Sequence, residues 1–212
     1  MLAVIPCRKG SKGIPNKNFR DFCGKPLWQW TANAAIGSGI FDHIVCSSDG
    51  GFNIKKYKNV LIDNYRPPEL STDEAQLEPL LKYYADLYKP GIVCLLQPTS
   101  PLRTLEDIRK AYLLMNTSSN YDSIVSVTSV GDKYWLKQKN EELKPLYDPL
   151  NRLNRQDLKT DTLFYENGAI YFTKNPNCRV GNKVGFYVMP QRRSFQVDSD
   201  YDWRVCEVLL NG

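Results

Sequence analysis

Residues 2–18 read LAVIPCRKGSKGIPNKN, and this stretch decides the fold. The apolar run 2–5 is typical of a buried β-strand. It leads into a loop that contains two glycines and four cationic side chains, Arg8, Lys9, Lys12 and Lys17. Glycine lets backbone N–H groups approach an anion closely, and the cations add fixed positive charge. The segment therefore predicts a strand followed by a loop that binds a polyphosphate.

The loop matches neither of the two common glycine-rich phosphate motifs. Gly10 and Gly13 lie three positions apart, whereas a Walker loop requires G-x-x-x-x-G-K-[ST], and the G-x-G-x-x-G fingerprint is also missing. The missing fingerprint disfavours an NAD-dependent dehydrogenase. A solvated basic turn is the alternative interpretation. The position after a buried-type strand favours a ligand site, because α/β sheets bind ligands at the carboxyl ends of their strands.

Beyond this loop, runs typical of strands alternate with segments of helical periodicity. The sequence predicts strands at 2–6, 44–47, 60–62, 92–96, 123–127, 168–173 and 184–189, and helices at 26–37, 73–88, 104–115 and 202–210. Such alternation predicts an α/β fold with a doubly wound, mostly parallel sheet. Ser71 or Thr72 is the expected cap of the second helix, and Thr104 that of the third.

The pattern changes between residues 130 and 166, which are polar and aromatic. Alternation near 134–136 and 141–147 favours an inserted hairpin or arm over another strand–helix unit. We therefore expect a single domain, 1–212, with an inserted arm at about 130–166.

Composition limits the classes of partner. The chain has 212 residues and a formal net charge of +5, and much of that charge lies between Arg8 and Lys25. A local anion site explains this distribution better than a nucleic-acid groove does. No stretch approaches the length of a membrane span, and the N-terminus shows no signal-peptide pattern. The sequence predicts a cytoplasmic protein with small-molecule substrates, without nucleic-acid or membrane partners.

The six cysteines show no C-x-x-C or zinc spacing, so we expect reduced core residues. His43 is the only histidine and is expected at the surface, at the start of a strand. A multi-histidine metal site is therefore excluded. Any metal must be held by oxygen ligands, which suits Mg²⁺ or Mn²⁺.

Three further segments carry candidate binding residues. Gln97 follows a buried strand in a turn rigidified by prolines and offers both a donor and an acceptor; a purely structural turn is the alternative. Arg66 could reach a phosphate, or it could be a surface arginine paired with Glu69. Asn167 and Tyr171 could meet a polar substrate, or Asn167 could simply form a turn with the following glycine.

A final segment, QVDSDYDW at 196–203, precedes the last helix. In an extended chain Asp198, Asp200 and Asp202 point to the same side, where they could hold Mg²⁺. Helix capping by Asp200 or Asp202 is the alternative. We expect both functions: Asp198 at the metal and a later aspartate as the cap.

Together these segments resemble the acylneuraminate cytidylyltransferases, which include the synthetases of CMP-sialic, CMP-legionaminic and CMP-pseudaminic acids. The resemblance spans nearly the whole chain, in order. The motifs that carry it are R-x-x-S-K-G-x-P-x-K-N at 8–18, GKPL at 24–27, R-P-x-E-L at 66–70, LLQPTSPLR at 95–103, NGAIY at 167–171 and V-D-x-x-x-D-W at 197–203.

The resemblance implies a Rossmann-like nucleotidyltransferase fold and a CTP-dependent reaction. The anomeric hydroxyl of a nine-carbon α-keto acid sugar attacks the α-phosphate of CTP, and pyrophosphate leaves. Residues implied to bind CTP are Arg8, Ser11, Lys12, Lys17, Asn18 and Arg66. Those implied to bind the sugar are Gln97, Arg155, Asn167 and Tyr171, with Arg155 at its carboxylate. Lys12, Lys17 and Asp198 are the implied catalytic residues, and Asp198 and Asp200 the implied ligands of Mg²⁺ or Mn²⁺.

The family is usually a homodimer whose arms help to complete the neighbouring site, and residues 154–158, NRQDL, are similar to its arm segment. One departure stands out. Many members carry D-x-D where this chain has Gln196-Val197-Asp198. A neutral amide is a poorer Mg²⁺ ligand than a carboxylate, so Asp198 is expected to hold the ion alone or with Asp200. A nucleotidyltransferase for another sugar or nucleotide, and a catalytically silent nucleotide-binding domain, remain the alternatives.

Overall fold

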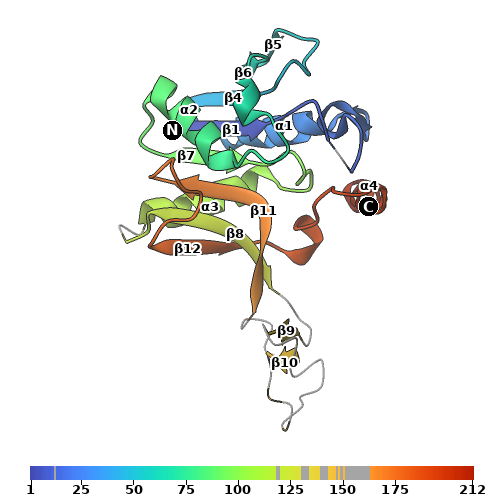
Figure 1. Cartoon of the computed structure of the whole chain (residues 1–212), viewed down its shortest axis with the longest axis vertical. Coiled ribbons are helices and arrows are strands. Elements are labelled where there is room, and N and C mark those ends of the chain that lie inside the picture. Colours follow the sequence, from blue (N-terminus) through green and yellow to red (C-terminus); the bar gives the residue numbers. More distant parts are fainter. Residues whose placement is uncertain are drawn as a thin grey trace.

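A computed structural model describes residues 1–11, 13–117, 120–129, 134–138, 143–146, 148, 150 and 163–212. Its main sheet has the strand order β12-β8-β11-β7-β1-β4-β6-β5 (Figure 1). The strands are β1 (Leu2–Pro6), β4 (His43–Ser47), β5 (Lys56–Tyr57), β6 (Val60–Asp63), β7 (Val93–Leu96), β8 (Ser123–Ser129), β11 (Phe164–Thr173) and β12 (Val184–Val188).

The sheet is mostly parallel, as predicted. Strands β7, β1, β4 and β6 run parallel to one another, and so do β8 and β12. Strand β11 lies antiparallel between β7 and β8, and β5 is an antiparallel edge strand. The carboxyl ends of the parallel strands therefore meet at one edge of the sheet, together with the start of β11.

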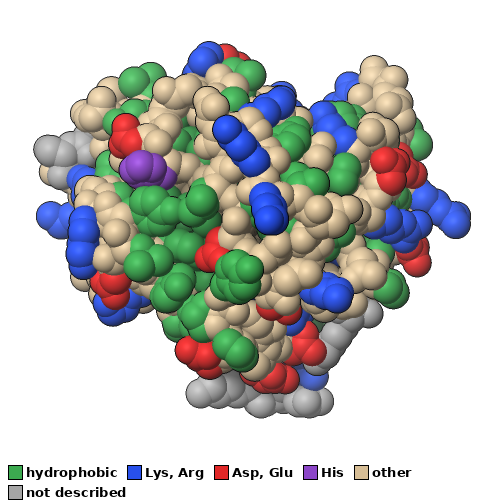
Figure 2. Space-filling view, turned by 90° about the horizontal axis from the view of Figure 1, so that it is seen from above, with side chains coloured by type: hydrophobic (Ala, Val, Ile, Leu, Met, Phe, Trp, Pro, Cys, Tyr) green, Lys and Arg blue, Asp and Glu red, His purple; other side chains and the backbone are tan. Residues whose placement is uncertain are grey.

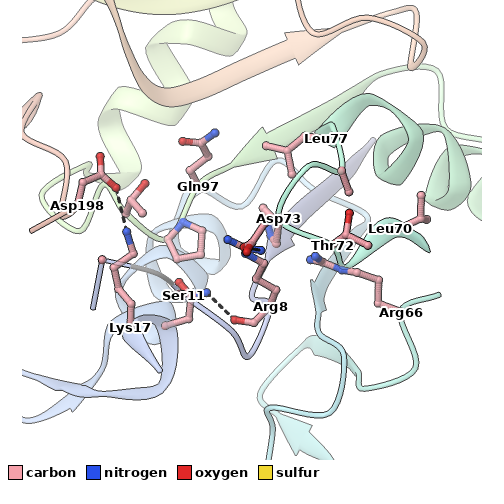
Figure 3. A pocket seen from close by; sticks show the side chains of 16 residues that line it. Arg8, Ser11, Lys17, Arg66, Leu70, Thr72, Asp73, Leu77, Gln97 and Asp198 are labelled. Atoms are coloured by element: carbon pink, nitrogen blue, oxygen red, sulfur yellow. Dashed lines mark hydrogen bonds and ion pairs between the residues drawn. The ribbon is translucent and has the colours of Figure 1, made fainter. Parts of the chain in front are cut away.

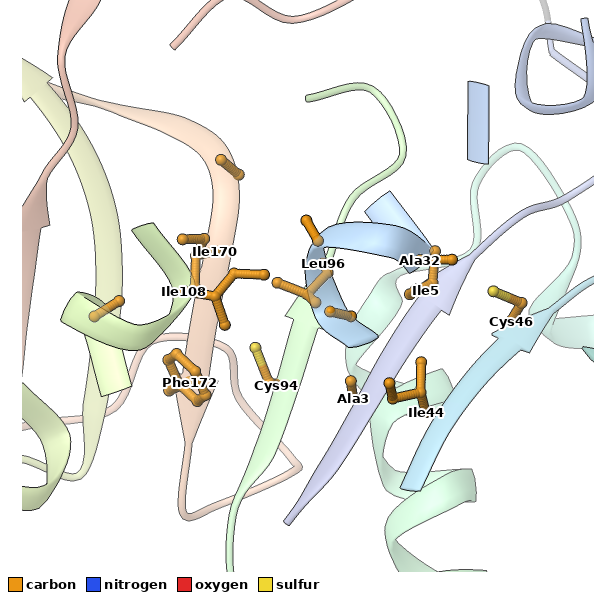
Figure 4. Close-up of a cluster of buried hydrophobic side chains, with 14 of the residues drawn as sticks. Ala3, Ile5, Ala32, Ile44, Cys46, Cys94, Leu96, Ile108, Ile170 and Phe172 are labelled. Carbon is orange, nitrogen blue, oxygen red and sulfur yellow. The ribbon is translucent and has the colours of Figure 1, made fainter. Parts of the chain in front are cut away.

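Helices cover both faces of the sheet, so the predicted doubly wound arrangement is confirmed. On one face, α1 (Leu27–Ser38) and α3 (Leu105–Thr117) pack on the side of the sheet that Ala3 and Ile5 occupy (Figure 4). On the other, α2 (Leu77–Tyr88) packs on Leu2 and Val4. Alternate residues of β1 thus enter opposite cores, which explains why residues 2–5 are continuously apolar.

A third apolar cluster lies beside the sheet, at α4 (Asp200–Asn211). Trp203 of α4 makes an edge-to-face contact with Phe22, with ring centroids 5.1 Å apart. Phe22 belongs to a small hairpin, β2 (Asp21–Phe22) and β3 (Lys25–Pro26), which the sequence analysis did not predict. Ile14 of the basic loop and Val197 are buried in the same cluster, so this core anchors two segments that carry candidate site residues.

Helix starts are where the prediction was least accurate. Helix α2 begins at Leu77, four residues later than expected, after the short 3₁₀ helix η2 (Pro68–Leu70), and neither Ser71 nor Thr72 caps it. Helix α4 begins at Asp200, and its cap is Ser199, whose side chain accepts a hydrogen bond from the Asp202 backbone. Neither aspartate is therefore the N-cap, although Asp202 completes the capping box.

The predicted hairpin inside the arm is present, as β9 (Trp135–Lys137) paired antiparallel with β10 (Leu143–Pro145), away from the main sheet (Figure 1). The arm ends earlier than expected, because β11 begins at Phe164 and pairs there with β8. Residues 164–166 therefore belong to the main sheet.

The remaining predictions concern surface and redox state. All six cysteines are free, as expected, and Cys7, Cys46, Cys94 and Cys206 are buried. Cys23 and Cys178 are only partly buried, so the prediction of a core position was wrong for these two. His43 is exposed, as expected (Figure 2). On the face shown in Figure 2, Lys and Arg are interspersed with Asp and Glu and form no continuous basic stripe. Among the described residues, no helix has the length and apolar character needed to cross a bilayer.

Candidate functional site

A cavity of about 390 Å³ lies where the carboxyl ends of β1, β6 and β7 meet (Figure 3). Each of these strands leads into a segment that supplies a lining residue: Arg8 after β1, Arg66 after β6 and Gln97 after β7. The sequence-predicted residues that line it are Arg8, Ser11, Lys17, Asn18, Arg66, Gln97 and Asp198. Segments that are far apart in the chain are thus brought together largely as predicted.

The basic loop is held in shape by its own polar contacts. The backbone N–H of Lys9 donates to Asp49 Oδ1 at 2.6 Å. Asn18 is buried, and its Nδ2 donates to the carbonyl oxygen of Arg8 at 3.1 Å, which closes the loop. The short 3₁₀ helix η1 (Lys17–Phe19) follows Asn16, whose φ of 52° is left-handed. Two hydrogen bonds therefore hold the described ends of the loop, at Lys9 and at Asn18.

Gly13 lets this loop approach the segment that carries Asp198. A Cβ added at Gly13 would lie 2.5 Å from the carbonyl oxygen of Asp198, closer than real Cβ contacts. On the same side, Lys17 Nζ donates to the carbonyl oxygen of Val197 at 2.6 Å and to Asp198 Oδ1 at 2.9 Å. The Asp198 carboxylate is thus held directly opposite the basic loop.

A second ion pair crosses the cavity. Arg8 Nη1 contacts Asp73 Oδ1, which comes from the loop between η2 and α2 (Figure 3). The two side chains are about one-third exposed. Thr72, Asp73 and Ala75 all line the cavity, and α2 begins only after them, at Leu77. Triphosphate oxygens at Arg8 would have to compete with Asp73 for the guanidinium.

Arg66 is buried and is not the surface arginine of the alternative interpretation. Its Nε donates to Ser47 Oγ at 3.1 Å and its Nη2 to the Ser47 carbonyl oxygen at 3.0 Å. Burial lowers the pKa of the Arg66 guanidinium from its ordinary value. Tyr84 of α2 also donates to Ser47 Oγ, at 2.7 Å. Ser47, which is held in this way, therefore fixes the Arg66 guanidinium where it lines the cavity.

Asn167 and Tyr171 are not brought to the cavity. Asn167 is buried, where its Oδ1 accepts from Ser126 Oγ at 2.6 Å and its Nδ2 donates to Ser194 Oγ at 2.9 Å. Tyr171 donates to Glu166 Oε2 at 3.1 Å, and burial raises the pKa of its hydroxyl to about 12. Asn167 thus ties β11 to β8 and to the segment after the 3₁₀ helix η4 (Gln191–Arg193), Tyr171 bonds within β11, and neither side chain lines the cavity.

The two candidate metal ligands also separate. Asp198 lines the cavity, whereas Asp200 contacts Arg20 Nη1 at 3.4 Å at the start of α4 and is not among the lining residues. Within the described part of the chain, no group of three or more His, Cys, Asp or Glu side chains is arranged to hold a metal. One carboxylate is nevertheless a suitable donor for Mg²⁺, which is commonly bound by one or two carboxylates, substrate phosphates and water.

Lys12 and Arg155 lie outside the described residues. Sequence reasoning missed Asp49, which supports the basic loop, and Asp73, which crosses the cavity. Asp49 follows β4, at the sheet edge where ligands bind, and this position was the available signal. Asp73 had been assigned to a helix by periodicity, so nothing in the local sequence indicated a long-range ion pair.

Comparisons with known proteins identify the family of the chain. A family model described as Cytidylyltransferase matches residues 2–206. N-acylneuraminate cytidylyltransferase A of Danio rerio is 30% identical over 97% of this chain and 49% of that protein. The N-acylneuraminate cytidylyltransferase of Streptococcus agalactiae serotype III (strain NEM316) is 33% identical over 94% of this chain and 50% of that protein. The chain spans about half the length of these curated relatives.

Solved structures confirm the fold. A CMP:2-keto-3-deoxy-manno-octonic acid synthetase in complex with CTP superimposes with a TM-score of 0.66 at 14% identity, over 99% of this chain and 98% of that one. The 4-diphosphocytidyl-2C-methyl-D-erythritol synthase of Anaerococcus prevotii gives 0.69 at 14% identity, over 100% and 98%. The resemblance inferred from the motifs is confirmed, and the chain belongs to the cytidylyltransferase family.

Proposed function

We propose that the chain transfers CMP from CTP to the anomeric hydroxyl of a nine-carbon α-keto acid sugar of the sialic acid type. The observation that carries this proposal is the cavity at the carboxyl edge of the sheet, where Arg8, Lys17 and Arg66 face Asp198. Family membership and the names of the half-length relatives support the nucleotide and the sugar class.

The reaction needs positioning and charge neutralisation more than covalent chemistry from the protein. The sugar hydroxyl oxygen forms a bond to the α-phosphorus of CTP, and the bond from that phosphorus to the bridging oxygen of pyrophosphate breaks. The hydroxyl proton passes to solvent. Arg8, Lys17 and Arg66 provide the positive charge that stabilises the triphosphate as charge builds up on the leaving group. Lys12 is proposed to act beside them.

Mg²⁺, or Mn²⁺ in its place, is proposed as the metal cofactor. When bound, it would neutralise phosphate charge and orient the α-phosphate. Asp198 is the residue that would hold it, because this carboxylate lies in the cavity while Asp200 faces Arg20. Lys17 Nζ donates to the Asp198 carboxylate at 2.9 Å and so keeps it in place.

The sugar is proposed to bind at the Gln97 end of the cavity, with Arg155 at its carboxylate. We also propose a homodimer in which the arm of one subunit approaches the site of the other. Apolar side chains on the arm support this idea, since Leu136, Leu143 and Leu146 are all exposed in the single chain. The multi-angle light-scattering mass should be twice that of the chain.

Two alternatives are distinguished by the same assay. The chain could use another nucleotide or sugar, or it could bind CTP without turnover. The second alternative is favoured by Gln196, which stands where many family members have an acid. Pyrophosphate release should be measured with CTP, UTP, GTP and ATP against eight- and nine-carbon α-keto acid sugars, with the product mass determined. We expect release only with CTP and a nine-carbon acid. Release with another nucleotide, or CTP binding without release, would refute the proposal.

A further inference from the structure

The side chain of Gln196 lies in a different place from that of its near neighbour Asp198. Asp198 lines the cavity, but Gln196 Nε2 donates to the carbonyl oxygen of Asn167, at the point where β11 bends into its bulge. The residue that the family resemblance aligns with a metal-binding acid is therefore committed to the backbone of β11.

Gly168 marks where two glutamine side chains converge. A Cβ added at Gly168 would overlap Gln196 Nε2 and would also come within 3.1 Å of Gln97 Oε1. The Gly168 φ of +67° is left-handed, which favours glycine as well. Both amides thus rest against the same small piece of backbone, one from the segment before Asp198 and one from the turn after β7.

The contact made by Gln196 requires a donor. A carbonyl oxygen accepts hydrogen bonds, so an amide N–H suits it, whereas a carboxylate there would place oxygen against oxygen. An Asp or Glu at this position could not make this bond at neutral pH. Gln196 therefore makes a contact that the acid found at this position in many family members could not make, so the exchange does more than remove a metal ligand.

Gln97, the other member of the pair, is available for a ligand. It lines the cavity, and within the described residues its side-chain amide makes no hydrogen bond. A neutral amide with both donor and acceptor capacity suits a sugar hydroxyl or an N-acyl group better than a phosphate or a metal ion. The cationic groups, Arg8 and Lys17, are provided by the basic loop instead.

We propose that Gln196 is a positioning residue of the acid-sugar site and not a metal ligand. By donating to the carbonyl oxygen of Asn167, Gln196 holds the backbone of β11 at Gly168 against Gln97. This contact fixes where the Gln97 amide meets an uncharged polar group of the sugar. This inference rests on the proposed function. It leaves Asp198 as the carboxylate that would hold Mg²⁺, since Asp73, the other carboxylate that lines the described cavity, contacts Arg8.

Two isosteric variants separate the two roles. Gln196→Glu keeps the size of the side chain but replaces the donor with a negative charge, and Gln196→Met removes both polar atoms without adding charge. Gln191→Glu is the matched control, because Gln191 lies in the same segment, is exposed and does not line the cavity. The readouts are the KM values for sugar and CTP, and the Mg²⁺ dependence of CTP affinity, measured by calorimetry without turnover.

We expect both Gln196 variants to raise the KM for the sugar about tenfold, the loss typical of one hydrogen bond. The KM for CTP and the Mg²⁺ midpoint of CTP binding should stay within about twofold of the wild type, as for a residue that contacts neither. A merely structural role would instead change both KM values together. The control should match the wild type in every readout.

The opposite split would overturn the inference. If Gln196→Glu lowers the Mg²⁺ midpoint several-fold while the KM for the sugar is unchanged, the position faces the metal. Failure of the proposed function looks different, because the wild type itself would then release no pyrophosphate with any sugar, and the assignment of Gln196 to a sugar site would fall with it.

Discussion

Arg193 anchors the segment that leads to the site, and its contacts allow the loss of stability in an Arg193→Met variant to be worked out. Arg193 ends the short 3₁₀ helix η4 (Gln191–Arg193), a few residues before Asp198. Its Nε and Nη2 bind both oxygens of Asp107 in α3, at 2.9 and 2.8 Å. Asp107 is fully buried, while the Arg193 side chain is 35% exposed. The pair is therefore a forked contact with one partner removed from water.

Breaking a buried pair by removing one partner typically costs about 3–5 kcal/mol. Here Tyr187 and Thr104 still donate to the Asp107 carboxylate, and Arg193 is only partly desolvated. We therefore expect Arg193→Met to lower the free energy of unfolding by about 2–3 kcal/mol. For a domain of this size that corresponds to a fall in Tm of roughly 4–12 °C.

The pH dependence provides an independent check. Burial raises the pKa of the Asp107 carboxyl, but hydrogen bonds from Arg193, Thr104 and Tyr187 outweigh this effect and leave the pKa below its ordinary value. A carboxyl whose pKa is lowered by folding stabilises the protein at pH values above its pKa in the unfolded chain, which is about 3.9. This stability is lost as the pH falls below that value. The difference in the free energy of unfolding between wild type and variant should be largest at neutral pH and should shrink below about pH 4.

Thermal and urea unfolding of Arg193→Met should be compared with those of Lys82→Met. Lys82 pairs with Asp86 at 2.7 Å, but both side chains are more than half exposed, so its loss should cost no more than about 0.5 kcal/mol. If the two variants unfold at the same temperature, or if the Arg193 effect persists undiminished at pH 3, the reasoning about the buried carboxylate is wrong.

Three further predictions concern the site. Lys17→Ala should lower turnover about 10²–10³-fold, the usual cost of losing one charge-stabilising donor, in a steady-state pyrophosphate assay where exposed Lys56→Ala stays at the wild-type rate; unchanged turnover would remove Lys17 from the mechanism. Asp198→Asn should abolish the Mg²⁺ response of turnover at an unchanged Tm, whereas Asp200→Asn should keep it, and the reverse order would exchange their roles. Gly13→Ala should reduce turnover about 10²-fold, because its Cβ would lie 2.5 Å from the Asp198 carbonyl oxygen, while Gly91→Ala, whose Cβ meets nothing within 4 Å and which does not line the cavity, should keep the wild-type rate; equal effects would contradict the close approach.

Local signals were sufficient for the framework of the fold. The apolar run at residues 2–5 and the cationic loop after it identified β1 and the ligand-binding edge, because both depend on neighbouring residues alone. The start of α2 was wrong for the opposite reason. Asp73 has a helix-compatible sequence context, but it pairs with Arg8, 65 positions away, and no local pattern reports that contact.

The sequence correctly predicted the site residues that follow parallel strands, but it was less accurate for the residues on β11. Arg66 and Gln97 follow β6 and β7, so the sheet brings them together. Asn167 and Tyr171 lie on a strand that runs antiparallel and carries a bulge, which changes the direction in which its side chains point. The spacing of residues cannot show that change, and both side chains turned out to be buried.

A crystal structure of the protein with CTP and Mg²⁺ is the most direct test of the account. It should show the triphosphate against the loop that carries Arg8 and Lys17, Arg66 at the nucleotide, and the ion bound to the carboxylate of Asp198. A nucleotide bound elsewhere on the sheet, with this cavity empty, would contradict the central claim.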